Sequence, residues 1–207
     1  MSINSVDEQG SEAWRLARVG KCTASMASAV LATIKNGEAA TRRNYRSALI
    51  VERLTGLPVD TYESLEMRWG RDQEPFARIC YESVTGNIVH KVGFIAHPEL
   101  MAGASPDGEI AGDGLLEAKC PNTATHIDTL LKGMSPDHIP QIQFQLWITG
   151  RAFCDFVSYD PRMPERMQLY VQRIERDNAY IERLEKEVRK FLAEVGRVIA
   201  ELEAKVR

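Results

Sequence analysis

The sequence predicts an α/β fold in which a central mixed β-sheet is flanked by helices and a long helix closes the chain. Three observations support this prediction. Apolar residues have helical spacing up to Thr85, short β-like runs follow, and a regular helical stripe begins at Ile181. The chain has 207 residues and no linker rich in proline, glycine and serine, so we expect one domain over residues 1–207.

The composition predicts a soluble globular chain. Hydrophobic residues make up 44% and charged residues 27%, and no apolar run is long enough to span a bilayer. No signal-peptide pattern opens the chain, so we expect a cytoplasmic protein with no membrane contact. The net charge of −3 gives no sign of nucleic-acid binding over the whole surface. Any contact with DNA must therefore be local.

Cysteines and histidines show no metal-binding pattern. The four cysteines stand far apart without a CxxC pair, and the four histidines lack the spacing of metal ligands. We therefore expect reduced thiols, and we interpret His126 and His138 as structural or exposed residues.

Two helices are expected in the first part of the chain. A short helix is expected to run through Val30, with residues 23–25 (Thr-Ala-Ser) as its N-terminal cap. A longer one covers Arg42 to Leu54, and Gly56 ends it.

A third helix fits Gln73 to Thr85. Pro75 falls in its first turn, where proline is tolerated, and Gly86 follows its end. Its expected buried face is apolar and consists of Phe76, Ile79, Cys80 and Val84.

Short β-like runs broken by glycine and proline come next. They are expected at Ile88–Gly93, Leu100–Ala104, Gly108–Ala111 and Leu115–Lys119. Gly112-Asp113-Gly114 is a turn signal between the last two runs, so we expect these runs to pair as a hairpin.

The remainder predicts a helix, two strands and a final helix. The first three are expected at His138–Thr149, Phe153–Tyr159 and Gln168–Ile174. The final helix would span roughly 40 Å at 1.5 Å per residue. Its stripe recurs at intervals of three and four and consists of Ile181, Leu184, Val188, Phe191, Val195, Val198 and Leu202. Such a stripe either packs on the sheet of its own chain or forms a contact between subunits.

Charged residues stand within the apolar run that ends at Lys119. Residues two apart on a strand point to the same face, so Glu117 and Lys119 project together while Ala118 points the other way. Asp107 precedes the first strand of the hairpin, and folding at the turn brings it beside Glu117. Two carboxylates and an ammonium group are therefore expected to converge.

Two carboxylates suit Mg²⁺ or Mn²⁺, which complete their shell with water and substrate phosphate. Such a site hydrolyses phosphodiesters, because the cation lowers the pKa of water and offsets charge on the transition state. Lys119 would orient the attacking water or stabilise its hydroxide form. The alternative is a surface ion pair between Glu117 and Lys119, worth under ~1 kcal/mol. The apolar neighbours of Glu117 favour the catalytic interpretation, because unpaired charge inside a protein is costly.

The same residues carry a resemblance to a known family. SPDG and GLLEAKCP resemble the core of the PD-(D/E)xK nuclease superfamily, which has a restriction-endonuclease-like fold. They are most similar to its phage recombination branch, which contains the lambda exonuclease and the YqaJ-like alkaline exonucleases. Further similar stretches follow the order of that family along nearly the whole chain: AWRLARVGKCTAS, WGRDQE, IPQIQFQLW and YDPRM.

The resemblance implies a role for each residue of the centre. Asp107 and Glu117 are implied metal ligands, together with the backbone carbonyl of Ala118, and Lys119 is the implied catalytic lysine. Glu74 matches an acidic residue that reaches the metal directly or through water.

Gln141 matches a glutamine placed to contact the attacking water or the DNA backbone. Glu74 and Gln141 also each have a non-catalytic interpretation. Glu74 in the first turn of a helix would complement the helix dipole, and Gln141 would face solvent together with Gln145.

The resemblance also implies a pocket for a 5′-terminal phosphate, formed by Arg18, Ser25 and Ser105. Arginine suits this task because its planar fork donates two parallel hydrogen bonds, and Ser25 lies near a helix N-terminus, where anions are favoured. The alternative for Arg18 is one more solvated cation. Further candidate DNA contacts are Lys35, Arg42 and Arg43.

The implied activity is that of an Mg²⁺-dependent 5′-to-3′ exonuclease, with Mn²⁺ as a substitute. It would digest the 5′-phosphorylated strand of duplex DNA to mononucleotides and leave 3′ overhangs. The implied assembly is a homotrimeric toroid that works beside a phage single-strand annealing protein in a bacterial host cell. Two alternatives stay open: a structure-specific or restriction-type endonuclease of the same fold, and a non-catalytic protein that binds DNA ends.

Overall fold

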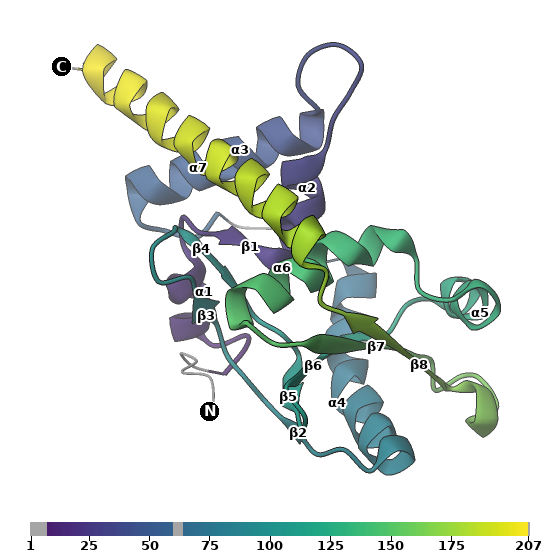
Figure 1. Ribbon diagram of the computed structural model, residues 1–207. Coiled ribbons are helices and arrows are strands. Elements are labelled where there is room, and N and C mark those ends of the chain that lie inside the picture. The colour runs from purple at the N-terminus through teal and green to yellow at the C-terminus, as the bar shows by residue number, and fades with distance from the viewer. Residues whose placement is uncertain (1–7, 60–63, 207) are drawn as a thin grey trace.

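The computed structural model describes residues 8–59 and 64–206. A five-stranded mixed sheet lies at the centre, with helices on both faces, and a long C-terminal helix lies across the helix of residues 40–55 (Figure 1). This arrangement confirms the predicted α/β class. None of the helices in the described ranges is both long enough and apolar enough to cross a membrane.

The five-stranded sheet has the order β2-β5-β6-β7-β8. Its strands are β2 (Val89–His90), β5 (Gly108–Ile110), β6 (Gly114–Lys119), β7 (Phe153–Tyr159) and β8 (Leu169–Glu175). β6 and β7 pair in parallel, and the other neighbours pair antiparallel. Because parallel strands need a crossover, the chain passes between β6 and β7 through two helices, α5 (Thr123–Lys132) and α6 (Ile139–Thr149).

The predicted hairpin is confirmed as the pairing of β5 with β6. Ile110 faces Gly114 across the turn, and Gly112 and Asp113 have φ angles of 78° and 71°. Glycine is also required at the start of β6, because a Cβ atom on Gly114 would lie 2.4 Å from the ring of Phe153. These contacts fix the register that places Glu117 and Lys119 on one face of the sheet.

Helix α4 (Leu65–Thr85) begins earlier than the sequence indicates, and Pro75 lies inside it. Ser64 caps the helix by accepting a hydrogen bond from the Met67 amide at 3.2 Å. The predicted buried face is wrong, since Phe76 and Ile79 are more than half exposed.

The face of α4 that packs on the sheet instead carries Ala77 and Tyr81. Both are fully buried with Leu116 and Val157. The tyrosine hydroxyl donates to Asp155 at 2.7 Å, so this inward face combines apolar packing with a polar bond inside the core.

The N-terminal part of the chain forms a second, three-stranded sheet of order β1-β4-β3, of which only β4 lies within a predicted run. Its strands are β1 (Cys22–Thr23), β4 (Ala102–Ala104) and β3 (Ile95–Ala96). The helices of this part are α1 (Glu12–Arg18), the 3₁₀ turn η1 (Ala24–Met26), α2 (Ala27–Leu31) and α3 (Ala40–Thr55). Neither η1 nor α2 has a side-chain cap, so the predicted capping by residues 23–25 is wrong. Gly56 ends α3 as predicted.

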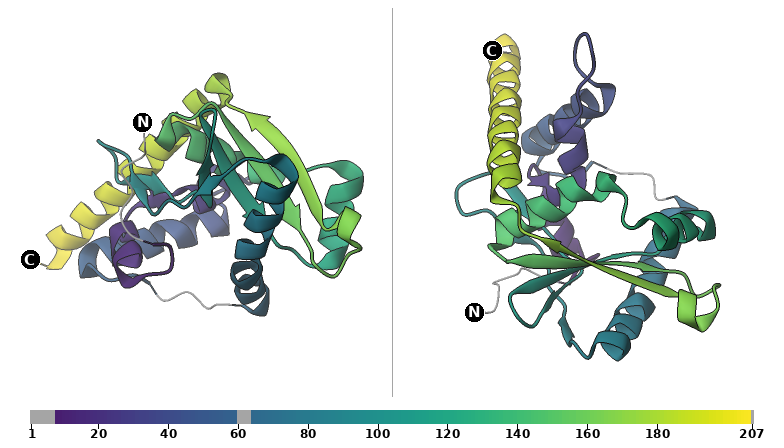
Figure 2. Two further views of the ribbon diagram at one scale, coloured as in Figure 1. Left: turned by 90° about the horizontal axis from the view of Figure 1, so that it is seen from below. Right: turned by 45° about the vertical axis from the view of Figure 1, so that its right-hand side comes forward.

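The final helix, α7 (Asn178–Val206), extends along the helical layer rather than the sheet (Figure 2). It contacts α2, α3 and α6, and its buried residues Leu184, Val188, Phe191 and Val195 join a cluster with those helices. Ile181, near its start, belongs instead to the cluster with Leu115, Cys154 and Phe156 of the five-stranded sheet. From Ile181 to Val195 the stripe therefore packs within its own chain, mainly on helices, whereas Leu202 is 41% exposed. Two 3₁₀ turns complete the chain, η2 (Pro136–His138) and η3 (Glu165–Met167).

Candidate active site

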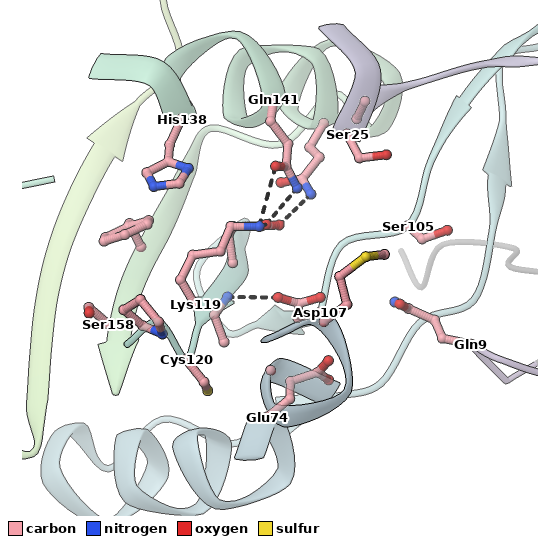
Figure 3. A pocket seen from close by; sticks show the side chains of 18 of the residues that line it. Gln9, Ser25, Glu74, Ser105, Asp107, Lys119, Cys120, His138, Gln141 and Ser158 are labelled. Carbon is pink, nitrogen blue, oxygen red and sulfur yellow. Dashed lines mark hydrogen bonds and ion pairs between the residues drawn. The ribbon is translucent and has the colours of Figure 1, made fainter. Parts of the chain in front are cut away.

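A cavity of about 540 Å³ opens between α4, α6 and the end of β6 (Figure 3). It brings together most of the residues that the sequence singled out. These are Arg18, Ser25, Glu74, Ser105, Asp107, Glu117, Ala118, Lys119 and Gln141. The sequence separation between α1 and α6 is large, so the cavity exists only in the folded chain.

Asp107 is attached to β6 by two hydrogen bonds. Its backbone amide donates to the carbonyl of Leu116 at 3.1 Å, and its Oδ2 atom accepts from the amide of Ala118 at 2.7 Å. Asp107 comes directly before β5, so the hairpin carries both carboxylates of the centre. The predicted convergence of Asp107 with Glu117 rests on this hairpin register.

Glu117 is almost completely buried, with 2% of its surface exposed. Its Oε1 atom accepts from Lys119 Nζ and from Gln141 Nε2, both at 2.5 Å. Its Oε2 atom accepts from Gln145 Nε2 at 2.6 Å. The ion pair with Lys119 therefore exists, but it is not the solvated surface pair of the alternative interpretation.

The pKa values of two carboxylates of the centre, Asp107 and Glu74, are raised. Burial, the charge of Glu117 and the charge of Glu74 raise the pKa of Asp107 well above its usual value. Burial also raises the pKa of Glu74, and Glu117 adds to the effect while Arg78 opposes it. Negative charge is therefore in excess at this point of the cavity.

Lys119 carries its charge at neutral pH. Burial acts to lower its pKa, but Glu117 and Asp107 outweigh burial and the pKa is raised. The ammonium group also lies 3.4 Å from Oε1 of Gln141, so it bridges the sheet and α6.

Glu74 lies well inside α4, not in a first turn, because the helix begins at Leu65. Its interpretation as a residue that only complements the helix dipole is therefore wrong. The carboxylate faces the cavity and lies 3.8 Å from Arg78, one turn further along the helix (Figure 3).

The donor set fits a hard divalent cation. Asp107 and Glu117 supply carboxylate oxygens, and a cation would offset both the burial and the neighbouring negative charge that raise the pKa of Asp107. No cluster of three or more His, Cys, Asp or Glu side chains with metal-binding geometry occurs within residues 8–59 and 64–206. Mg²⁺ accommodates this, because it usually binds one or two protein carboxylates and keeps several waters.

The opposite side of the cavity is formed by the N-terminal segment. The guanidinium of Arg18 lies 4.1 Å from the ring centre of Trp14, and the indole of Trp14 donates to Oγ of Ser105 at 2.9 Å. Burial lowers the pKa of Arg18, with opposing effects from Tyr45 and Glu52. Arg18 is thus held against an aromatic ring at the cavity wall, unlike a freely solvated cation. Ser25 points into the same space from η1 (Figure 3).

The three further DNA-contact candidates do not line this cavity. Arg42 donates to Glu38 and to Glu194, each at 2.7 Å, so its charge is already matched within the chain. Lys35 and Arg43 are exposed.

The sequence did not single out several residues of the site, Gln145 and His138 among them. Gln145 was paired with Gln141 only as a solvent-facing residue, yet it is 1% exposed and bonds Glu117. The spacing of four between the two glutamines was the available signal, since such residues share a helix face. His138 also lines the cavity, stacked on Phe156 with ring centres 5.1 Å apart, and no sequence signal marks it.

An acidic pair with a lysine, set at the end of a strand in a mixed sheet and facing a cavity, is an arrangement suited to phosphodiester hydrolysis, the reaction of a nuclease. Residues 13–152 match the model of the YqaJ-like viral recombinase domain. The chain belongs to this family.

Solved structures show the same relationship. The alkaline exonuclease LHK-Exo from Laribacter hongkongensis is 47% identical, with a TM-score of 0.87 over 95% of this chain and 98% of that one. A complex of LHK-Exo with dAMP gives 46% identity and a TM-score of 0.88 over the same shares. A phage-related exonuclease from Haemophilus somnus 129PT shares the fold at 14% identity, with a TM-score of 0.72 over 88% of this chain and 96% of that one.

A shorter match occurs among curated proteins. An uncharacterised Escherichia coli K12 protein, ExoD, is 31% identical over 65 residues, which cover 31% of this chain and 74% of that protein. The exonuclease relatives and the site together identify the chain as a nuclease.

Proposed function

We propose that this nuclease is an Mg²⁺-dependent 5′-to-3′ exonuclease that digests the 5′-phosphorylated strand of duplex DNA to mononucleotides. The observation that carries the proposal is one cavity with Asp107, Glu117 and Lys119 on one wall and Arg18 and Ser25 on the other. A phosphate held by Arg18 would place the next phosphodiester along the strand within reach of the acidic pair. The product duplex would carry 3′ overhangs.

The residues of the acidic wall have separate tasks in this proposal. Asp107, Glu117 and the carbonyl of Ala118 would hold Mg²⁺. When bound, this ion supplies a water of lowered pKa and offsets charge on the phosphate in the transition state. Lys119 holds positive charge beside the scissile phosphate or the attacking water, because its neighbouring carboxylates keep it protonated. Gln141 keeps Lys119 and Glu117 together.

The bonds that break and form in this reaction explain why cleavage can repeat along the strand. Water attacks the phosphorus between the first and second nucleotides, and the bond from phosphorus to the 3′ oxygen of the first nucleotide breaks. The leaving oxygen becomes a 3′ hydroxyl, and the shortened strand keeps a new 5′ phosphate. That phosphate is the group that Arg18 is proposed to hold, so each product end is again a substrate.

Three DNA substrates test this function. Linear duplexes with labelled 5′-phosphate or 5′-hydroxyl ends, and a covalently closed circle, are incubated with Mg²⁺ and with EDTA. We expect labelled mononucleotides from the phosphorylated end, slower release from the hydroxyl end, no cutting of the circle and no product in EDTA. Cleavage of the circle would indicate an endonuclease. Retention of the linear duplex without cleavage would indicate a DNA-end-binding protein.

We also propose that the chain acts as a homotrimeric ring beside a phage single-strand annealing protein in the host cytoplasm. A ring reconciles the net charge of −3 with DNA binding, because Lys35 and Arg43 would gather positive potential in a central channel while the outer surface stays acidic. Light scattering should give about three times the 23.3 kDa mass of the chain. A monomer at micromolar concentration would refute the ring and leave the nuclease chemistry standing.

A further inference from the structure

Gln145 holds the buried carboxylate of Glu117 from α6. It is 1% exposed, lines the active-site cavity and donates from Nε2 to Oε2 of Glu117 at 2.6 Å. The orientation of the amide is determined, since a carboxylate oxygen accepts and cannot donate. The Oε1 atom of Gln145 is buried and accepts no hydrogen bond from the described part of the chain.

A second glutamine on the same helix shows what a structural amide looks like in this fold. Gln143 is 2% exposed, and both ends of its amide are paired with backbone groups. Its Nε2 atom donates to the carbonyl of Glu175 at 2.8 Å, and its Oε1 atom accepts from the amide of Asp177 at 2.9 Å. Gln143 therefore ties α6 to the connection between β8 and α7. Gln145 differs, because within residues 8–59 and 64–206 the single hydrogen bond of its side-chain amide is to Glu117.

The hydrogen bonds of Glu117 leave one lone-pair site of its carboxylate without a partner among the described residues. A carboxylate has about four lone-pair sites, two on each oxygen. Lys119 and Gln141 occupy both sites on Oε1, and Gln145 occupies one site on Oε2. The remaining site is on Oε2, and the bond from Gln145 sets where it points. A carboxylate with only its Oε1 atom held would still be able to turn about its last torsion, which is soft.

We propose that Gln145 is a positioning residue that orients Oε2 of Glu117 for a divalent cation. The inference rests on the proposed function, because it assigns a task within the same metal site. Some residues hydrogen-bond to a metal ligand without touching the metal. Their removal typically lowers metal affinity or activity by about 10- to 100-fold. A residue that only stabilised the fold would not alter affinity selectively.

The test compares Gln145→Met with Gln143→Met in the full-length protein. Methionine has a similar length and cannot donate the hydrogen bond, and each variant loses a buried amide of the same helix. Calorimetric titration of DNA-free protein with Mn²⁺ measures affinity, and thermal unfolding without the ion measures stability. We expect Gln145→Met to bind Mn²⁺ about 10- to 100-fold more weakly than wild type. Gln143→Met should lose stability and keep wild-type affinity.

A second variant covers the outcome in which Gln145→Met does not fold. Gln145→Asn keeps an amide but shortens the side chain, so it should fold and show the same loss of Mn²⁺ affinity. Wild-type affinity in either folded Gln145 variant, or an equal loss in Gln143→Met, would overturn the inference. Failure of wild type to bind Mn²⁺ would also overturn it. Failure of wild type to cleave DNA, with Mn²⁺ binding and its dependence on Gln145 intact, would instead reject the proposed function.

Discussion

Lys119 Nζ lies 2.5 Å from Oε1 of Glu117, although only 2% of the glutamate side chain is exposed. The lysine itself is 32% exposed, so the pair joins the protein interior to the cavity. A buried carboxylate is costly unless it is paired and hydrogen-bonded, and here Lys119 shares that task with Gln141 and Gln145. The ammonium can therefore face the cavity while it compensates the buried charge of Glu117.

Replacement of Lys119 should separate catalysis from metal binding. We expect Lys119→Met to lower the single-turnover rate of DNA cleavage by about 10²- to 10³-fold, because a positioned charge on the transition state is lost. Mn²⁺ binding by calorimetry should persist, since Asp107 and Glu117 remain. Lys132→Met is the matched control, because Lys132 is exposed and pairs with Asp128 on the same helix. A near wild-type rate in Lys119→Met would remove the lysine from the mechanism.

Arg18 should determine the preference for phosphorylated ends. Arg18→Ala should slow digestion of 5′-phosphorylated duplex and shrink its advantage over the 5′-hydroxyl duplex, because the lost bonds discriminate between these substrates. The ratio of the two rates is the measurement. Arg15→Ala provides the control, since Arg15 lies on the same helix but is exposed and does not line the cavity. An unchanged ratio in Arg18→Ala would refute a role of Arg18 in binding the 5′ phosphate.

Asp160 should make stability depend on acid pH. Burial acts to raise its pKa, but hydrogen bonds from Arg162 and Thr123 outweigh burial and hold the pKa at about 2. Because the folded pKa is depressed, the stabilisation is complete above the unfolded pKa, near 4, and is lost as pH falls through about 2. We expect Asp160→Asn to cost about 1–2 kcal/mol at pH 7, after allowance for the solvent exposure of Arg162.

Urea unfolding at two pH values checks this expectation. The difference in unfolding free energy between wild type and Asp160→Asn should fall to about half near pH 3. An equal difference at pH 7 and pH 3 would show that the charge of Asp160 is not the source of the stabilisation.

Tyr81 should stabilise the packing of α4 on the sheet. Its hydroxyl donates to Asp155 at 2.7 Å and accepts from Asn87 at 3.0 Å. Because a hydrogen bond to a charged group contributes about 1.5–3 kcal/mol, Tyr81→Phe should lower the melting temperature by about 3–12 °C. Tyr180→Phe should change it little, since no hydrogen bond of the Tyr180 hydroxyl occurs in the described part of the chain. Equal effects in the two variants would contradict the role of Tyr81.

The sequence predicted those parts of the fold and site that depend on local pattern. The hairpin and its turn, the strand Phe153–Tyr159 and the shared face of Glu117 and Lys119 follow from period two and turn chemistry. The buried face of α4 was missed because it depends on tertiary contacts distant in the sequence, namely the packing of Ala77 and Tyr81 on the sheet and the bond from Tyr81 to Asp155. Gln145 was missed for the same reason, since a glutamine is expected to face water unless a buried partner, here the Glu117 carboxylate, bonds it.

The hairpin has a kinetic consequence for assembly of the centre. Asp107 and Glu117 meet through β5 and β6, which are adjacent in the chain, and hairpins form in about 1–10 μs. Gln141 and Gln145 reach Glu117 only after the chain has crossed through α5 and α6. Contacts of such long sequence separation close slowly, so the acidic pair should form before its amide partners arrive. Changes at Gln145 should then accelerate unfolding while leaving the folding rate nearly unaltered.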